Sequence, residues 1–133
     1  MLTSLKQRIA RDESGFTLIE LLVVLIIIGV LLAIAVPSYL AFRDKAEKRA
    51  SAANARSAMP AAEVYYLDQD PNTYSGIGVN ALQARDVGVR LNSASATNAG
   101  HGYCLASKVG GWWGYVNGPG ANPVNTSQAA DPC

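Results

Sequence analysis

The sequence predicts an α+β fold, in which a long N-terminal α-helix, hydrophobic in its first half, packs by its second half against a small antiparallel β-sheet head. An unbroken apolar run, followed by a helix-forming segment with one apolar face, predicts the helix up to Leu67. Beyond Leu67, short β-forming segments alternate with glycine-rich turns, which predicts the sheet. The 133 residues suffice for one small domain, and the net charge of +1 gives no general attraction to nucleic acid.

The N-terminal segment combines a charged start with an apolar run long enough to cross a membrane. The residues up to Gly15 are mostly polar and charged, and from Leu21 to Val36 the chain contains only Leu, Val, Ile, Ala and one Gly. Continued as a helix through Phe42, the segment exceeds the roughly 20 residues that cross the hydrocarbon core. A secretory signal places its cleavage site after the apolar stretch, whereas here the plausible site precedes it. Basic residues flank both ends, so charge alone does not orient the segment.

Three residues distinguish this segment from a plain membrane anchor. Glu20 places a carboxylate inside the apolar segment, where ionised side chains are costly and commonly functional; a tolerated glutamate near the membrane interface is the alternative. Pro37 removes a backbone hydrogen bond and favours a kink, and Gly29 weakens the same helix. Gly29 and Pro37 therefore bound a short stretch that can be drawn out of helical conformation.

The sequence from Arg11 to Glu20, Arg-Asp-Glu-Ser-Gly-Phe-Thr-Leu-Ile-Glu, joined to the apolar run, resembles the class III signal peptide of type IV pilins and type II secretion pseudopilins. The resemblance implies that a prepilin peptidase cuts after Gly15 and methylates the new N-terminal residue, Phe16. It also implies that Glu20 attracts Phe16 of a neighbouring subunit during assembly. The close match covers the first third of the chain, and from Ala41 onward the resemblance is one of architecture.

The resemblance implies a division of the chain into four parts. Residues 1–15 are a cleaved leader peptide, and residues 16–42 are the transmembrane and filament-core helix. Residues 43–67 are an amphipathic helix that continues into the head, and residues 68–133 form the head, with its sheet and C-terminal disulfide loop. The precursor then lies in the inner (cytoplasmic) membrane, and the mature chain in an extracellular pilus. The implied partners are identical subunits in a helical filament, the prepilin peptidase, the inner-membrane assembly platform, the membrane before assembly, and DNA or a surface receptor outside the cell.

The second half of the helix carries a face of mostly small apolar residues. They recur at spacings of three and four: Ala52, Ala55, Met59, Ala62 and Tyr66. Because these side chains are small, we expect a flat element such as a sheet to lie close against them. Pro60 interrupts the pattern and predicts a bend or a lost hydrogen bond at that point.

The head is expected to contain one short helix and about three strands. Asn80 is placed to act as an N-cap, with Gln83 at N3, for a helix that ends at Asp86. The segments with strand-like patterns are Val87–Leu91, Gly102–Val109 and Trp112–Val116. Trp112 and Trp113 point to opposite faces of the last strand, so we expect one in the core and the other exposed.

The chain has two cysteines, Cys104 and Cys133. In an exported protein an even count predicts one disulfide, which here closes a loop of about 30 residues and fastens the C-terminal loop onto the sheet. In the chain-entropy treatment such a link stabilises the fold by about 3–4 kcal/mol. The alternative is a pair of free thiols in a cytosolic protein.

Two segments imitate ligand sites. Asp68, Asp70 and Asn72 have the spacing that opens a calcium loop, but the required glycine is replaced by Thr73 and the final glutamate by Val79. The segment Gly76-Ile77-Gly78-Val79-Asn80-Ala81 imitates a dinucleotide fingerprint without the surrounding parallel strands. We therefore expect no metal site and no cofactor.

Other isolated residues also carry no chemistry. His101 is the single histidine, with no partners for a triad or metal set, and is interpreted as a turn residue. Asn125-Thr126-Ser127 is a glycosylation sequon that chance explains. We expect no catalytic residue, and the chain is not predicted to be an enzyme.

The leading hypothesis is a structural subunit, the major pilin, of a type IV pilus that serves adhesion, twitching motility or DNA uptake. The alternative within the family is a pseudopilin of a type II secretion system. Pseudopilins commonly keep calcium ligands in the C-terminal loop, where this chain offers only Asp131 and a cysteine. A third hypothesis is a membrane-anchored binding domain that never polymerises; Glu20 argues against it, because a monomeric anchor has no use for an embedded carboxylate.

Overall fold

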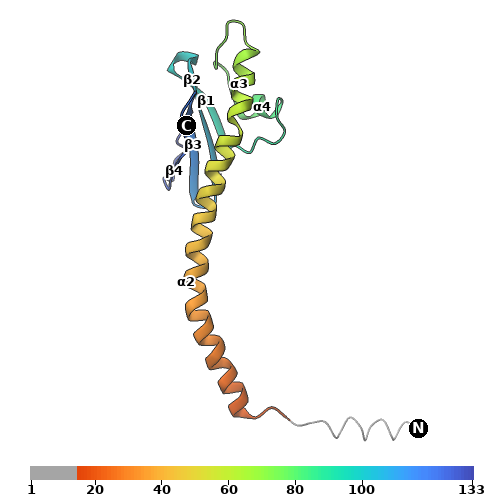
Figure 1. Cartoon of the computed structure of the whole chain (residues 1–133), viewed down its shortest axis with the longest axis vertical. Coiled ribbons are helices and arrows are strands. Elements are labelled where there is room, and N and C mark those ends of the chain that lie inside the picture. Colours follow the sequence, from red (N-terminus) through yellow and green to blue (C-terminus); the bar gives the residue numbers. More distant parts are fainter. Residues whose placement is uncertain (1–14) are drawn as a thin grey trace, which may run out of the picture. The chain divides into compact units, whose positions relative to one another are not determined.

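A computed structural model describes residues 15–133 (Figure 1). The leader segment before Gly15 lies outside the described residues. The described chain groups into two compact units, the first ending at Leu40 and the second spanning Ala41–Cys133. One long helix with a four-stranded antiparallel sheet confirms the predicted α+β class.

Helix α2 (Leu18–Ser57) contains the apolar run, and helix α3 (Met59–Leu67) follows it after Ala58. By length and composition, the helical span Leu18–Leu67 includes a stretch able to cross a membrane, and no residue of that stretch is buried in the isolated chain. Helix α2 continues through Gly29 and Pro37, so the extension of this stretch stays a prediction about the assembled state. Pro60 lies in the first turn of α3, where its missing N–H is tolerated. The predicted interruption near Pro60 is therefore confirmed.

The sheet is a simple meander in the order β1-β2-β3-β4 with every pair antiparallel. Its strands are β1 (Ser93–Thr97), β2 (Gly102–Val109), β3 (Trp112–Gly118) and β4 (Val124–Thr126). The predicted strand at Val87–Leu91 is wrong: the segment begins with a turn, in which the Val89 N–H donates to the carbonyl of Asp86, and then continues without regular structure. The first strand instead comes after this segment, in the sequence Ser-Ala-Ser-Ala-Thr. It was not predicted because these residues have weak β-propensity.

The short helix of the head, α4 (Val79–Gln83), begins two residues earlier and ends three residues earlier than predicted. Gly78 is its N-cap residue and makes no side-chain capping hydrogen bond, so the predicted capping role of Asn80 is wrong. The Gln83 side chain donates to the carbonyl of Val89 (3.3 Å) and ties the helix to the turn after it.

One face of the sheet packs on the second half of α2 and on α3 (Figure 1). The predicted small-residue face is confirmed at its centre, because Ala55 and Ala62 are fully buried against the sheet residues Leu105 and Val116. Gly114 permits the closest approach, since a Cβ at this position would collide with the backbone of Ser51.

Asn125 fastens β4 to the same point of α2. Its side-chain N–H₂ group donates to the Lys48 carbonyl (2.9 Å), the Ser51 hydroxyl (3.1 Å) and the Trp113 carbonyl (3.4 Å). The amide nitrogen of the sequon is thus already engaged in holding the strand against the helix.

The other face of the sheet is closed by the C-terminal segment. A disulfide joins Cys104 on β2 to Cys133, with their Cα atoms 5.5 Å apart, which confirms the predicted pairing. The Ser93 hydroxyl adds a hydrogen bond to Asp131 (2.7 Å). Trp113 is buried on this face, whereas Trp112 is half-buried on the helix side, so the two tryptophans do face opposite ways.

Candidate assembly site at the start of helix α2

Thr17 and Glu20 form a reciprocal cap on the first turn of α2. The Thr17 N–H and hydroxyl both donate to Glu20 Oε2, at 2.8 and 2.7 Å, and the Glu20 N–H donates back to Thr17 Oγ1 at 3.3 Å. This is a capping box, in which two helix-end donors that would otherwise lack partners are satisfied. Such satisfaction matters most in a lipid environment, where water cannot supply the missing bonds.

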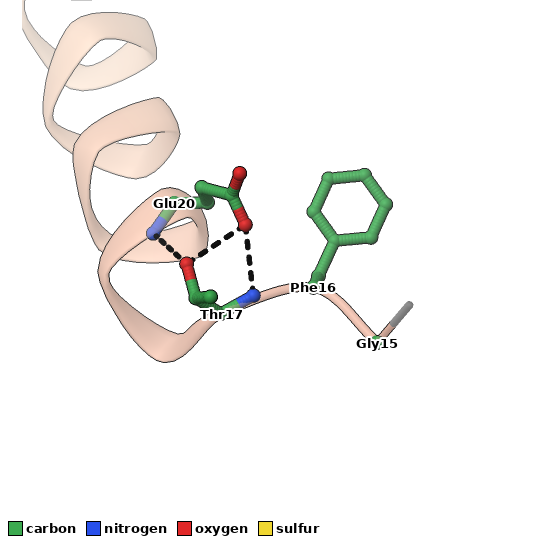
Figure 2. Close-up of a pocket in the computed structure, with 4 residues that line it drawn as sticks. All are labelled: Gly15, Phe16, Thr17 and Glu20. Atoms are coloured by element: carbon green, nitrogen blue, oxygen red, sulfur yellow. Dashed lines mark hydrogen bonds between the residues drawn. The ribbon is translucent and has the colours of Figure 1, made fainter. Parts of the chain in front are cut away.

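The second carboxylate oxygen of Glu20 is left free for another donor. Figure 2 shows one oxygen of Glu20 turned back over Thr17 and the other pointing away from it. Within residues 15–133, Oε1 has no hydrogen bond. The capping box therefore fixes the direction of the carboxylate while leaving it able to accept one charge-assisted bond, which an ammonium group would supply.

Gly15 and Phe16 precede the helix in a non-helical conformation. A Cβ built on Gly15 would meet nothing within 4 Å, and Phe16 is 80% exposed. Together with Thr17 and Glu20 they line one open hollow at this end of the chain (Figure 2). The peptide bond after Gly15 is thus accessible, and its two residues line the same hollow as Glu20.

The structure brings some of the predicted site residues together and separates others. Gly15, Phe16 and Glu20 share the hollow, whereas Gly29 and Pro37 lie further along α2. Sequence reasoning missed Thr17, although its signal was present: Thr-x-x-Glu directly before an apolar run is the sequence pattern of a capping box. In the part of the chain that the structure describes, no three metal-ligating side chains gather.

A polar cluster fastens the β2–β3 turn to the helix where the second unit begins. The Trp112 indole N–H donates to Asp44 (2.5 Å), Lys48 pairs with Asp44 (3.1 Å), and the Lys48 ammonium lies 3.7 Å from the centre of the Trp112 ring. The hydrogen bond from Trp112, then that from Lys48, holds the pKa of Asp44 below its ordinary value. Glu47 adds an ion pair with Arg43 (2.7 Å) and accepts from the Gly111 N–H (3.2 Å).

A second polar group links α3 to the sheet. The hydroxyls of Tyr74 and Tyr103 donate to the two oxygens of Glu63, at 3.0 and 3.3 Å. Burial, followed by the negative charge of Glu63, raises the pKa of Tyr103 to about 12 and raises the pKa of Tyr74 as well. Both tyrosines therefore stay neutral donors, and the group has the character of a structural network.

Comparison with known proteins finds a family match confined to the N-terminal region. Residues 10–36 match the family described as the prokaryotic N-terminal methylation motif. No solved structure is a significant match to the chain.

Curated relatives fall into two groups. The chain is 29% identical over 120 residues to the type IV wide pilus major component PilA4 of Thermus thermophilus, covering 88% of this chain and 92% of the relative. It is 30% identical over 83 residues to the type IV major pilin protein PilA of Myxococcus xanthus, covering 61% of this chain and 38% of the relative. It is 33% identical over 78 residues to the type II secretion system core protein G of Pseudomonas aeruginosa, covering 59% of this chain and 55% of the relative. The chain thus spans about half the length of this secretion protein.

Proposed function

We propose that this chain, whose residues 10–36 match the N-terminal methylation motif and which is similar to type IV pilins and to type II secretion core protein G, is the major subunit of an extracellular type IV pilus. The observation that carries the proposal is the capped carboxylate of Glu20 at the start of an exposed apolar helix. A monomeric anchor has no use for such a group, whereas a polymer built through this helix can use it to set subunit spacing.

Processing is the first proposed step. A prepilin peptidase hydrolyses the accessible bond between Gly15 and Phe16, which leaves a free amine on Phe16 that is then methylated. The methylated amine keeps its positive charge. Until assembly, the mature chain stays in the cytoplasmic membrane through α2.

Assembly then joins charges of two subunits. The ammonium of Phe16 on one subunit donates to Glu20 Oε1 of its neighbour, while Oε2 stays bound to Thr17. Both charges are neutralised inside an apolar filament core, where an unpaired charge would be strongly disfavoured. This pair fixes the vertical register, and the stretch between Gly29 and Pro37 extends as neighbouring helices pack.

The head would then form the filament surface. Residues 68–133 carry the sheet, and the disulfide keeps the C-terminal loop closed in the oxidising exterior. Filaments of this kind would serve adhesion, twitching motility or DNA uptake, with a surface receptor or DNA as external partner. The inner-membrane assembly platform is the proposed partner during growth.

A type II secretion pseudopilin is the second candidate. Its support is the 33% identity to core protein G, which exceeds the 29% identity to PilA4 but extends over only 78 residues. The near-complete coverage of PilA4 favours the pilin. In this structure the sole carboxylate of the C-terminal loop, Asp131, accepts hydrogen bonds from Ser93 and from the backbone of Cys133.

Electron microscopy of sheared surface material, combined with deletion of the gene, tests the proposal. We expect long filaments that contain this chain as their main component and that vanish on deletion, while protein secretion continues. Loss of secretion with intact surface filaments would select the pseudopilin, and a membrane-bound monomer without filaments would refute both.

A further inference from the structure

The face of α2 that points away from the sheet carries unpaired positive charge just after the apolar run. Phe42, Lys45 and Arg49 follow one another at spacings of three and four and so lie along one side of the helix. All three are exposed. The opposite side of the same turns faces the head, where Asp44 binds Trp112 and Ser51 is fully buried. We call the pair Lys45 and Arg49 the basic face.

The basic face lies at the depth of lipid headgroups when α2 crosses a membrane. At 1.5 Å per residue, Lys45 and Arg49 follow Phe42 by about 4.5 and 10.5 Å of helix, and a tilt of the helix reduces their height above the membrane. The headgroup layer on each side of the hydrocarbon core is about 5–7 Å thick. Long basic side chains also bend back several ångströms toward a membrane surface. The exposed aromatic rings of Tyr39 and Phe42 suit the same interface.

Neighbouring acids do not neutralise the basic face. Asp44 is engaged by Trp112 and Lys48, and Glu47 by Arg43. Within residues 15–133 neither Lys45 nor Arg49 forms an ion pair. The positive charge is therefore available to an external anion.

A second copy of this chain offers few carboxylates that lack a hydrogen-bond or ion-pair partner of their own. Among the side-chain carboxylates of residues 15–133, only Asp70 has neither a hydrogen bond nor an ion pair. The others are engaged within the chain: Glu20, Asp44, Glu47, Glu63, Asp68, Asp86 and Asp131. A layer of lipid phosphates, in contrast, is continuous and negative at the depth where the basic face lies.

We propose that Lys45 and Arg49 bind anionic phospholipid headgroups on the outer side of the cytoplasmic membrane while the subunit awaits assembly. This inference rests on the membrane-bound stage of the proposed function and adds a lipid preference to it. The bound headgroups hold the start of the head at the membrane surface. Extraction of the subunit into a filament must then break these contacts, so lipid composition influences how readily subunits leave the membrane.

The test measures lipid selectivity of the full-length chain in vesicles of phosphatidylcholine containing a minor share of phosphatidylglycerol. Electron spin resonance of spin-labelled phosphatidylglycerol and phosphatidylcholine gives their relative association with the protein. We expect the wild type to associate more strongly with phosphatidylglycerol than with phosphatidylcholine. At low salt, each basic residue should contribute a preference of at most about fivefold. The double variant Lys45→Gln/Arg49→Gln should lose that preference, as should the wild type in high salt.

The matched control is Arg90→Gln/Lys108→Gln, which removes the same charge from exposed positions elsewhere in the head. It should keep the lipid preference. The proposal would be overturned if Lys45→Gln/Arg49→Gln kept the wild-type lipid selectivity, or if both double variants lost it equally. It would also be overturned by a zero-length cross-link between Lys45 and Asp70 of a second copy. Flotation of the chain with vesicles is scored first: failure to float contradicts the membrane stage of the proposed function itself, whereas flotation without selectivity contradicts only the lipid contact.

Discussion

The indole N–H of Trp112 donates a hydrogen bond to the carboxylate of Asp44, 68 residues earlier in the chain. This bond joins the first residue of β3 to α2, and the Lys48 ammonium lies over the same indole ring. The turn between β2 and β3 is thereby held against the helix at the point where the apolar run ends. The stability of this contact between turn and helix should depend on the charge state of Asp44.

Asp44→Asn should remove a part of the acid sensitivity of the head. Since the folded-state pKa of Asp44 lies below the ordinary value of 3.8, its contribution is present above that pH and is lost as the pH falls through the lower, folded-state pKa. Thermal unfolding of the full chain in detergent, followed by circular dichroism from pH 2 to neutrality, checks this. In Asp44→Asn, the unfolding temperature should fall less steeply as the pH is lowered. Asp70→Asn, which changes a carboxylate without a partner, should leave the pH dependence of the wild type unchanged.

Gly15→Leu should block processing. The branched leucine side chain would fill the open space beside the Gly15–Phe16 peptide bond. Because that space is then occupied, we expect that the peptidase cannot place this bond in its active site. Mass spectrometry of the wild-type surface form should show a chain that begins at Phe16 and is heavier by one methyl group, whereas the variant should remain full-length in the membrane. Gly29→Leu, the same change within the apolar run, should still be cut; normal export of Gly15→Leu would refute the assigned cleavage site.

Glu20→Ala and Glu20→Gln should insert and be cleaved but assemble poorly. Both variants lose the charge that we propose pairs with the Phe16 ammonium, and the glutamine keeps the shape of the side chain. The yield of sheared filaments, measured against the mature subunit left in the membrane, should fall at least tenfold for both. Glu20→Asp, which retains the charge, should assemble better than either, and wild-type yields from Glu20→Gln would show that the carboxylate is incidental.

Thr17 should affect filament assembly because its hydroxyl orients the carboxylate of Glu20. Thr17→Val keeps the volume but removes the hydroxyl that donates to Glu20 Oε2, so the carboxylate is less well aimed at its partner. Thr17→Ser keeps the hydroxyl. The same filament assay should therefore show reduced yield for Thr17→Val and near-normal yield for Thr17→Ser, and equal yields from the two variants would contradict a positioning role.

Gly114→Ala should destabilise the head, because the added methyl group collides with the backbone of Ser51 and forces β3 away from α2. Overpacking of this kind costs about 1–3 kcal/mol. Gly111→Ala is the control, since its methyl group would meet nothing within 4 Å. Denaturant unfolding should give a lower free energy of unfolding for Gly114→Ala than for Gly111→Ala. Equal free energies of unfolding would mean that β3 can shift away from α2 without loss of stability.

Sequence patterns predicted the features whose signal is local. The apolar run, the embedded Glu20 and the small-residue face of the helix follow from composition and spacing, and the cysteine count pointed to the disulfide. The strand Ser93–Thr97 was missed because its small polar residues have little strand preference of their own, and pairing with β2 imposes its conformation. Strand β4 has three residues and is defined mainly by its register with β3 and by Asn125 reaching α2. Such pairings depend on partners distant in sequence, which no window of neighbouring residues reveals.

The attachment of Cys133 to Cys104 also determines how the head responds to mechanical force. A pull on the C-terminal loop does not have to travel through the short edge strand β4, because the disulfide carries it directly into β2. Strand β2 is hydrogen-bonded to β1 on one side and to β3 on the other, so both ladders resist its displacement together. Displacement of an edge strand breaks one ladder of hydrogen bonds, whereas displacement of an interior strand breaks two. A pull on the C-terminal loop is therefore transmitted to a strand that two neighbours hold in place.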